Sequence, residues 1–192
     1  MGRIHLKSGT LLAPLPAVMV TVGDMENSNI ITVAWTGILS SDPPRAYISV
    51  RPSRHSHKIL KEKGEFVINL TTQSLAKSTD YSGIFTGAKV DKFEKCGLTK
   101  VESEKVAAPT IAESPLSLEC KVFEVMESGT HDIFLADIVS VSCREDIMDE
   151  GGRICLEKAG LMAYSHGEYY ALGKKLGKFG FSAVKKKKRP RK

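Results

Sequence analysis

Residues 17–35 read AVMVTVGDMENSNIITVAW, and this stretch decides the fold class. Its two ends, residues 17–22 and 30–35, are apolar and rich in β-branched side chains, which favours strands. The cluster GDMENSN between them has the composition of a turn. Because strands joined by so short a connection pair side by side, the stretch predicts a β-hairpin and hence an antiparallel sheet.

The rest of the chain repeats this pattern of short apolar runs separated by turn residues. Further strands are predicted at residues 46–50, 65–70, 115–128 and 131–143. The third of these runs loses its alternation near Phe123, which indicates a β-bulge. The segment SSDPPR, residues 40–45, is predicted to form a loop because it contains two prolines.

Helical stretches are short and few. A helix is predicted over residues 57–63, where Ser56 can act as the N-cap and Gly64 can end the helix. Two weaker helical stretches lie within residues 73–83 and 90–97. The regular strand–helix alternation of a parallel sheet is missing, so the chain is predicted to be mainly β, an antiparallel Greek-key barrel or sandwich with a few short helices.

The net charge of +6 is concentrated at the C-terminus. Residues 185–192, KKKKRPRK, carry seven basic side chains and no acidic one, which leaves 21 basic and 22 acidic residues, a net charge of −1, in residues 1–184. The predicted organisation is therefore a single domain over 1–184 and a basic disordered tail over 185–192. A nearly neutral body is not a basic nucleic-acid-binding domain, although the tail alone could touch nucleic acid or anionic lipid.

The sequence also indicates where the protein works. No apolar run approaches the length needed to cross a bilayer, and the N-terminus lacks the apolar segment of a signal peptide. A cytoplasmic protein without membrane contact is therefore expected. The four cysteines are widely spaced with no C-x-x-C pair, which argues against a zinc site or a redox dithiol. Cys120 and Cys143 fall in strand patterns and are predicted to be buried.

Residues 49–60, SVRPSRHSHKIL, gather basic and hydroxyl side chains between a predicted strand and a predicted helix. Strand alternation turns Arg51 away from the core. Guanidinium groups, hydroxyls and a helix N-terminus together form an anion site, for which phosphate is the obvious ligand. A solvated basic loop explains the same residues equally well. His55 and His57 could instead bind a metal, but no acidic or thiol partner is near in sequence.

A flat ring could bind beside this anion site. Trp35 and Tyr47 supply aromatic rings there, although Trp35 could equally be a core residue. Small side chains on one predicted face let a planar ring approach the backbone, at Thr32, Ala34 and Thr36. Motifs of other enzyme classes are missing, since no G-x-S-x-G elbow occurs and GIFTGAKV does not match the P-loop. Chemistry by a bound cofactor is therefore favoured.

Taken in order and spacing, several segments resemble the flavin reductase-like family, in particular its flavoredoxin branch. They are NSNIITVAW, DPPRAYISVRPSRHSHKIL, EFVINL, TDYSGIFTG, VDKFEKCGL and GTHDIFLADIVSV, and the resemblance covers about residues 12–180. It implies an FMN-binding split β-barrel that is usually a homodimer, with FMN near the subunit interface. It also implies an FMN-dependent oxidoreductase, either an NAD(P)H-dependent flavin or ferric reductase or a flavoredoxin-type carrier that receives electrons from a redox protein. A non-catalytic FMN-binding or sensing module is the alternative.

The resemblance also assigns site residues. The implied FMN-binding residues are Asn29, Thr32, Ala34, Trp35, Thr36, Ser49, Val50, Arg51, Arg54, His55, Ser56, Ser82 and Gly83. His131 matches a histidine near flavin and nicotinamide, which makes it the candidate catalytic residue, although an ordinary strand-start histidine is the alternative. No metal is implied. Thr130 stands where the family has aspartate and Ala136 where a glycine is common, and these departures bear on NAD(P)H use more than on FMN binding.

Overall fold

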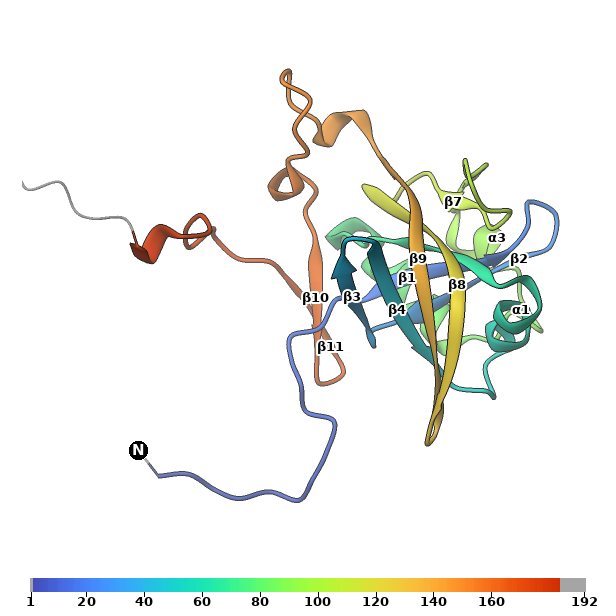
Figure 1. The fold of residues 1–192 in the computed structure, drawn as a ribbon, viewed down its shortest axis with the longest axis horizontal. Helices are drawn as coiled ribbons and strands as arrows, with labels where there is room; N and C mark the ends of the chain where they lie inside the picture. The colour runs from blue at the N-terminus through green and yellow to red at the C-terminus, as the bar shows by residue number, and fades with distance from the viewer. Residues whose placement is uncertain (1, 184–192) are drawn as a thin grey trace, which may run out of the picture.

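The computed structural model describes residues 2–183, and the predicted basic tail lies outside these residues. A seven-stranded antiparallel sheet dominates the fold, which confirms the mainly β prediction (Figure 1). The strand order is β2-β1-β5-β8-β9-β4-β3. The strands are Val18–Gly23 (β1), Ser28–Val33 (β2), Thr36–Ser41 (β3), Pro44–Val50 (β4), Glu65–Asn69 (β5), Leu116–Ser128 (β8) and His131–Cys143 (β9).

Hairpins between consecutive strands account for most of the sheet. The hairpin predicted from residues 17–35 is confirmed, with Val18 opposite Val33 in the β1–β2 pair. The long strands β8 and β9 pair along their whole length, and β5 joins β8 to β1. The register of β8 shifts between Val122 and Glu124, which confirms the predicted bulge near Phe123.

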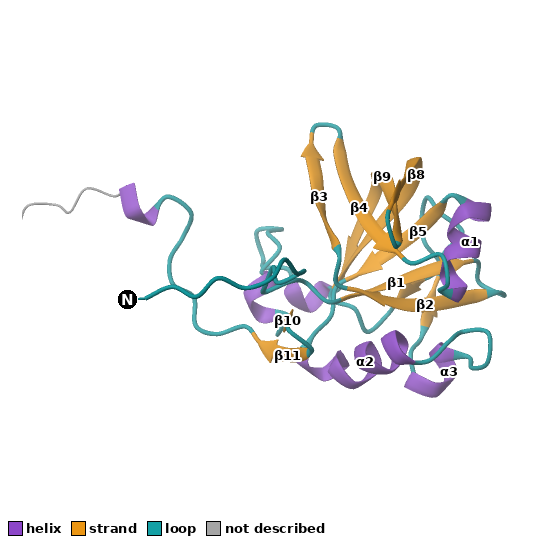
Figure 2. Ribbon diagram, turned by 90° about the horizontal axis from the view of Figure 1, so that it is seen from below, coloured by secondary structure: helices purple, strands orange, loops and turns teal. Residues whose placement is uncertain are grey.

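The sheet curls rather than lying flat. Figure 2 shows β3 and β4 splaying away from β1 and β2. The two halves meet at one end, where the backbone amide of Ser49 in β4 donates a hydrogen bond of 2.9 Å to the carbonyl of Trp35, just after β2. An antiparallel sheet that curls until its halves touch at one end forms an incompletely closed barrel.

The apolar core fills the inside of this curled sheet. All six residues of β1 are buried, because both of its faces are covered. Val20 and Val22 belong to the main core cluster, whereas Met19 packs with Ile30 and Phe93 on the other face. A strand buried on both faces requires a continuous apolar run, which explains why AVMVTV lacks strict alternation.

Short helices and small strands surround the sheet. They are α1 (His55–Lys63), α2 (Ala76–Ile84), α3 (Lys92–Cys96), the 3-10 turns η1 (Gln73–Leu75), η2 (Glu145–Ile147), η3 (Leu156–Lys158) and η4 (Phe181–Ala183), and the strands β6 (Lys100–Val101), β7 (Thr110–Ile111), β10 (Met162–Ser165) and β11 (Glu168–Ala171). The weaker helical stretches predicted within residues 73–83 and 90–97 are confirmed as η1 with α2 and as α3. The predicted end of α1 at Gly64 is also confirmed, because this residue has a left-handed φ of 66°. No helix in the described part of the chain has the length and apolar composition that crossing a membrane requires.

The predicted loop over residues 40–45 is right only at its centre, because the turn comprises Asp42 and Pro43 and the flanking residues belong to strands. β3 and β4 form a hairpin there, and Pro44 is the first residue of β4, a position that strands tolerate for proline. Local pattern does not reveal β3 because Ile38 and Leu39 are exposed, so no buried alternation marks the strand. The prediction of two buried cysteines is half right: Cys120 is buried and Cys143 is only partly buried.

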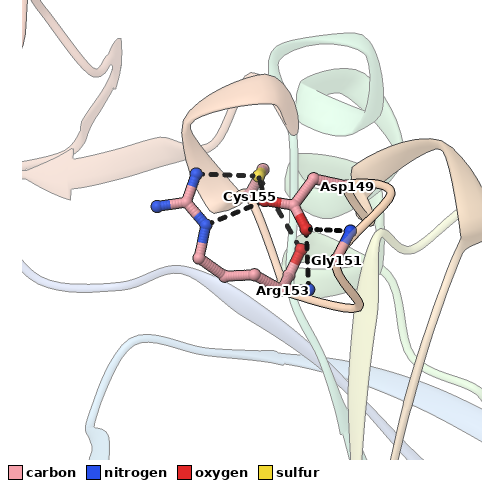
Figure 3. A network of polar contacts seen from close by, with 4 residues as sticks. All are labelled: Asp149, Gly151, Arg153 and Cys155. Carbon is pink, nitrogen blue, oxygen red and sulfur yellow. Dashed lines mark hydrogen bonds and ion pairs between the residues drawn. The ribbon is translucent and has the colours of Figure 1, made fainter.

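After β9 the chain passes through a loop that Asp149 holds together (Figure 3). Its carboxylate accepts hydrogen bonds from the backbone amides of Gly151 at 3.1 Å and Arg153 at 2.9 Å, and from Arg153 Nε at 3.0 Å. The buried thiol of Cys155 lies 3.5 Å from Arg153 Nη2. These bonds fix the loop that leads towards the β10–β11 hairpin.

Candidate functional site

A cavity of about 360 Å³ lies where the ends of β2 and β4 meet the start of β9. We call it the broad cavity. The predicted site residues that line it are Thr32, Ala34, Trp35, Ser49, Val50, Arg51, Arg54, Gly83 and His131. The β10–β11 hairpin contributes Tyr164, Gly167 and Tyr169, and α2 contributes Asp80. Aromatic rings and backbone-exposing small residues together suit a planar ligand.

A second cavity of about 80 Å³ adjoins the first. We call it the narrow cavity. The predicted site residues that line it are Asn29, Arg54, His55, Ser56, Ser82 and Gly83, and it also contains Thr86, Gly87 and Lys92. Arg54 and Gly83 border both cavities, so the two form one elongated site. A ligand that fills this site has a wide end and a slender end.

The narrow cavity has the chemistry of an anion site. Lys92 is buried, and its amine donates hydrogen bonds to the carbonyls of Ile30 at 2.6 Å and Ser82 at 2.8 Å. Burial, and then the charge of Arg54, lower the pKa of Lys92 to about 8. The hydroxyl of Ser82 is buried without a hydrogen-bond partner within the described chain. A buried cation and an unpartnered hydroxyl that line the same small cavity suit a bound anion.

The predicted N-cap role of Ser56 is wrong. α1 begins at His55, two residues earlier than predicted, and Arg54 occupies the N-cap position without a side-chain cap bond. Ser56 lies in the first helical turn, where its hydroxyl accepts a hydrogen bond of 2.7 Å from Asn29 Nδ2. This buried contact ties β2 to the start of α1 at the edge of the narrow cavity.

At the same edge of the narrow cavity, the backbone at Gly87 passes close to the side chain of Asn29. A Cβ atom on Gly87 would lie 2.1 Å from Asn29 Oδ1, far inside contact distance. A side chain at position 87 would therefore displace either Asn29 or the segment after α2. With glycine there, the backbone of this segment lies against the narrow cavity.

Trp35 and His131 form one wall of the broad cavity. Their ring centroids are 4.5 Å apart with planes tilted by 41°. Trp35 is 37% exposed, so the alternative that it is an ordinary core residue is wrong. Partial burial, followed by the charges of Arg51 and Arg54, lowers the pKa of His131 below its usual value of 6.5. The imidazole is therefore mainly neutral at pH 7, with Nδ1 located 2.9 Å from the hydroxyl of Thr130.

Some residues from the predicted ligand site lie elsewhere. Thr36 is outside both cavities, because it begins β3 and donates a hydrogen bond of 2.6 Å to the carbonyl of Tyr47. Tyr47 packs against Gly37 instead of lining a cavity. His57 contacts Asp132 at 2.7 Å, and no group of three potential metal-ligating side chains is present among residues 2–183.

Sequence reasoning missed several lining residues, of which Lys92 is the most informative. It is the first residue of α3, where a positive charge opposes the helix dipole. A lysine at this unfavourable helix position is the local sequence feature that could have marked Lys92 as a site residue. Tyr164 and Tyr169 gave no such signal, because their place beside the cavity depends on where the β10–β11 hairpin packs.

The curled antiparallel sheet and its two adjoining cavities define an open β-barrel protein with an elongated, ligand-sized site. Residues 11–173 match the family model described as the flavin reductase like domain, and the chain belongs to this family. The sequence resemblance to this family is thus confirmed.

Three relatives place the chain within the family. Flavoredoxin of Desulfovibrio vulgaris (Miyazaki F) is 32% identical, with a TM-score of 0.87 over 95% of this chain and 99% of that chain. A protein of Shewanella frigidimarina described as having a split barrel domain is 25% identical, with a TM-score of 0.77 over 86% of this chain and 85% of that chain. The NADH-dependent FAD reductase of Streptomyces globisporus is 27% identical over 73% of this chain and 78% of its own length. The predicted split-barrel fold is confirmed by these similarities.

Proposed function

We propose that the protein is an FMN-dependent oxidoreductase that passes electrons through a bound flavin. The observation that carries this proposal is the junction of the broad cavity with the narrow, cationic cavity at Arg54 and Gly83. FMN has the matching form, since a flat ring system and a phosphate are joined by a slender polar chain. The names of the flavoredoxin and FAD reductase relatives support a flavin.

The residues of the narrow cavity fit the phosphate of FMN. Arg54 and Lys92 supply positive charge, and the unpartnered hydroxyl of Ser82 supplies a further donor. A space of about 80 Å³ suits one phosphate group better than the diphosphate and adenosine of FAD. FMN, when bound, supplies the transfer of a hydride or of single electrons.

The chain's own residues bind and orient this cofactor and its electron donor. Trp35 and His131 close one side of the broad cavity and limit the access of water to the ring end of the site. The neutral imidazole of His131 can donate or accept one hydrogen bond, so it is suited to orient a nicotinamide carboxamide. No side chain is required to form a bond with the substrate.

The first experiment identifies the cofactor. Flavin released from the purified protein is identified by chromatography, and the apo protein is titrated with FMN, FAD and riboflavin. We expect FMN to bind about ten- to a hundredfold more tightly than riboflavin, because charged hydrogen bonds contribute about 1.5–3 kcal/mol each. Equal affinities for FMN and riboflavin would contradict the phosphate assignment.

The second experiment identifies the electron donor. The flavin spectrum is followed anaerobically after addition of NADH, NADPH or reduced ferredoxin. Reduction by either nicotinamide supports a reductase, whereas reduction by ferredoxin alone supports a flavoredoxin-type carrier. A flavin that none of these donors reduces would favour the non-catalytic module.

Replacing His131 with alanine is expected to slow flavin reduction by a nicotinamide while FMN remains bound. The expected loss is roughly two- to tenfold, the contribution of one hydrogen bond that orients the donor. Anaerobic stopped-flow measurements give the rate, and His166→Asn, on the exposed turn between β10 and β11, serves as the control. Wild-type rates in His131→Ala would leave this residue with a purely structural role.

We also propose a homodimer in the cytoplasm. The chain segments at both ends leave the body of the protein (Figure 1). Their apolar side chains Leu6, Leu12, Leu176 and Phe179 are each at least 75% exposed. Apolar side chains left uncovered in this way favour a partner surface. The C-terminal segment follows directly after β11, so docking on a second copy would place that copy near the broad cavity.

The four free cysteines support the cytoplasmic location, because they fit a reducing compartment.

The dimer is tested by adding charge to the C-terminal segment. The double variant Leu176→Glu, Phe179→Glu is expected to sediment as a monomer, because a buried carboxylate without a partner is strongly unfavourable. Lys178→Glu, a charge change at an exposed polar position of the same segment, is expected to remain dimeric. A monomeric wild-type protein would contradict the proposal.

A further inference from the structure

A buried hydrogen-bonded contact links α1 to the start of β9. His57 Nε2 lies 2.7 Å from Asp132 Oδ2, and the two side chains are only 9% and 8% exposed. Lys61 Nζ, one turn further along α1, lies 3.4 Å from the same oxygen. The ring of His57 also packs edge-on against Phe134, with centroids 5.5 Å apart.

Neither His57 nor Asp132 lines the broad or the narrow cavity, yet each is next in sequence to a residue that does. Ser56 precedes His57 and lines the narrow cavity. His131 precedes Asp132 and lines the broad cavity. Because neighbouring side chains on a strand point to opposite faces, Asp132 can point inward to α1 while His131 points into the cavity.

The chemistry of the pair indicates positioning rather than simple packing. The hydrogen bond from His57, supported by Lys61, lowers the pKa of Asp132 by more than burial raises it, so the group is a carboxylate at neutral pH. A buried hydrogen-bonded pair that contains a charge often stabilises a fold no better than apolar residues of similar size. Such a pair does, however, fix one geometry, because a displaced carboxylate would lose its partners in an apolar surrounding.

We propose that the His57–Asp132 contact positions both ends of the cofactor site at once, by holding the first turn of α1 against the start of β9. Its effect on cofactor binding rests on the function proposed above, whereas its effect on the position of His131 does not. His57 and Asp132 are thus positioning residues. They act through Arg54 and Ser56 at the narrow cavity and through His131 at the broad cavity.

Tryptophan fluorescence of the apo protein tests the position of His131 without any cofactor. Trp35 is the single tryptophan of the chain and lies 4.5 Å from His131, so its emission reports on this contact. We expect Asp132→Ala and His57→Ala to shift the emission towards that of His131→Ala. His57→Gln keeps a donor near the position of Nε2 and is expected to retain the wild-type emission.

Cofactor titration and reduction kinetics test whether the His57–Asp132 contact affects both the narrow and the broad cavity. In Asp132→Ala we expect roughly tenfold weaker FMN binding, together with slower reduction at saturating FMN. His57→Ala is expected to lower both the affinity and the rate in the same way, whereas His57→Gln is expected to keep both at wild-type values, which a loss of general stability would not explain. Glu62→Gln, which breaks the exposed Lys58–Glu62 pair on the same helix, is the matched control and should change neither.

Two results would overturn the inference. One is wild-type Trp35 emission in a folded Asp132→Ala or His57→Ala protein. The other concerns the double variant Asp132→Ala, His57→Ala. If the two residues act as one contact, this variant should lose no more FMN affinity than either single variant does, so a loss equal to the sum of the two single losses would contradict the inference. If Asp132→Ala does not fold, the comparison of His57→Ala with His57→Gln decides. If the protein binds no flavin, the emission experiment still decides.

Discussion

Replacing Lys92 with methionine is expected to weaken FMN binding by about ten- to a hundredfold, the largest effect of any single substitution in the site. The amine is buried and donates a hydrogen bond to the carbonyl of Ser82, so its charge is poorly screened by water. Methionine keeps most of the side-chain volume and removes the charge. Isothermal titration of apo protein with FMN measures the change.

The matched control for this substitution is Lys95→Met in the same short helix. Lys95 is exposed and borders neither cavity, so its loss should leave FMN affinity unchanged. Riboflavin provides the second comparison, because it lacks the phosphate. Lys92→Met should weaken FMN binding much more than riboflavin binding, and an equal loss for both ligands would show that Lys92 acts on the ring or the fold.

The lowered pKa of Lys92 also predicts how FMN affinity depends on pH. With a pKa of about 8 in the free protein, the amine is charged below pH 8 and loses its proton above it. A bound phosphate favours the charged form, so binding above pH 8 requires proton uptake and affinity falls by up to about tenfold per pH unit. Lys92→Met should abolish this fall. A wild-type affinity that stays constant above pH 8 would contradict the assignment.

Replacing Gly87 with alanine is expected to damage the fold and the cofactor site together. The added Cβ would lie 2.1 Å from Asn29 Oδ1, so either the segment or Asn29 must move. Overpacking of this kind costs about 1–3 kcal/mol, which lowers Tm by about 2–4 °C per kcal/mol in a domain of this size. FMN affinity should fall roughly tenfold, because Asn29 holds Ser56 at the narrow cavity.

A double variant separates the collision from other causes. Asn29→Ala removes the atoms that the new Cβ would meet, so Asn29→Ala, Gly87→Ala should melt at a higher temperature than the sum of the single losses predicts. Gly173→Ala is the control, since a Cβ at that glycine meets nothing within 4 Å. Additive losses in the double variant would show that contact with Asn29 does not cause the loss in Gly87→Ala.

Local sequence pattern was sufficient for the elements whose burial is regular. β9 occupies the residues that its apolar alternation predicted, and the β8 bulge follows the slip in phase. Gly64 ends α1 because glycine readily adopts the left-handed backbone conformation that is found there. β3 has no such signal, since it is held by pairing with β4 while its apolar side chains remain exposed.

By itself, then, the sequence determined every long strand except β3, the C-terminal end of α1 and the basic loop after β4, because each follows from the character of neighbouring residues. Only the tertiary structure decided which distant residues share the site. Lys92 reaches the carbonyl of Ile30 across 62 positions, and His57 meets Asp132 across 75. Such contacts depend on how the sheet curls and where helices pack on it. The spacing of apolar residues carries no information about side chains that meet only after the barrel has formed.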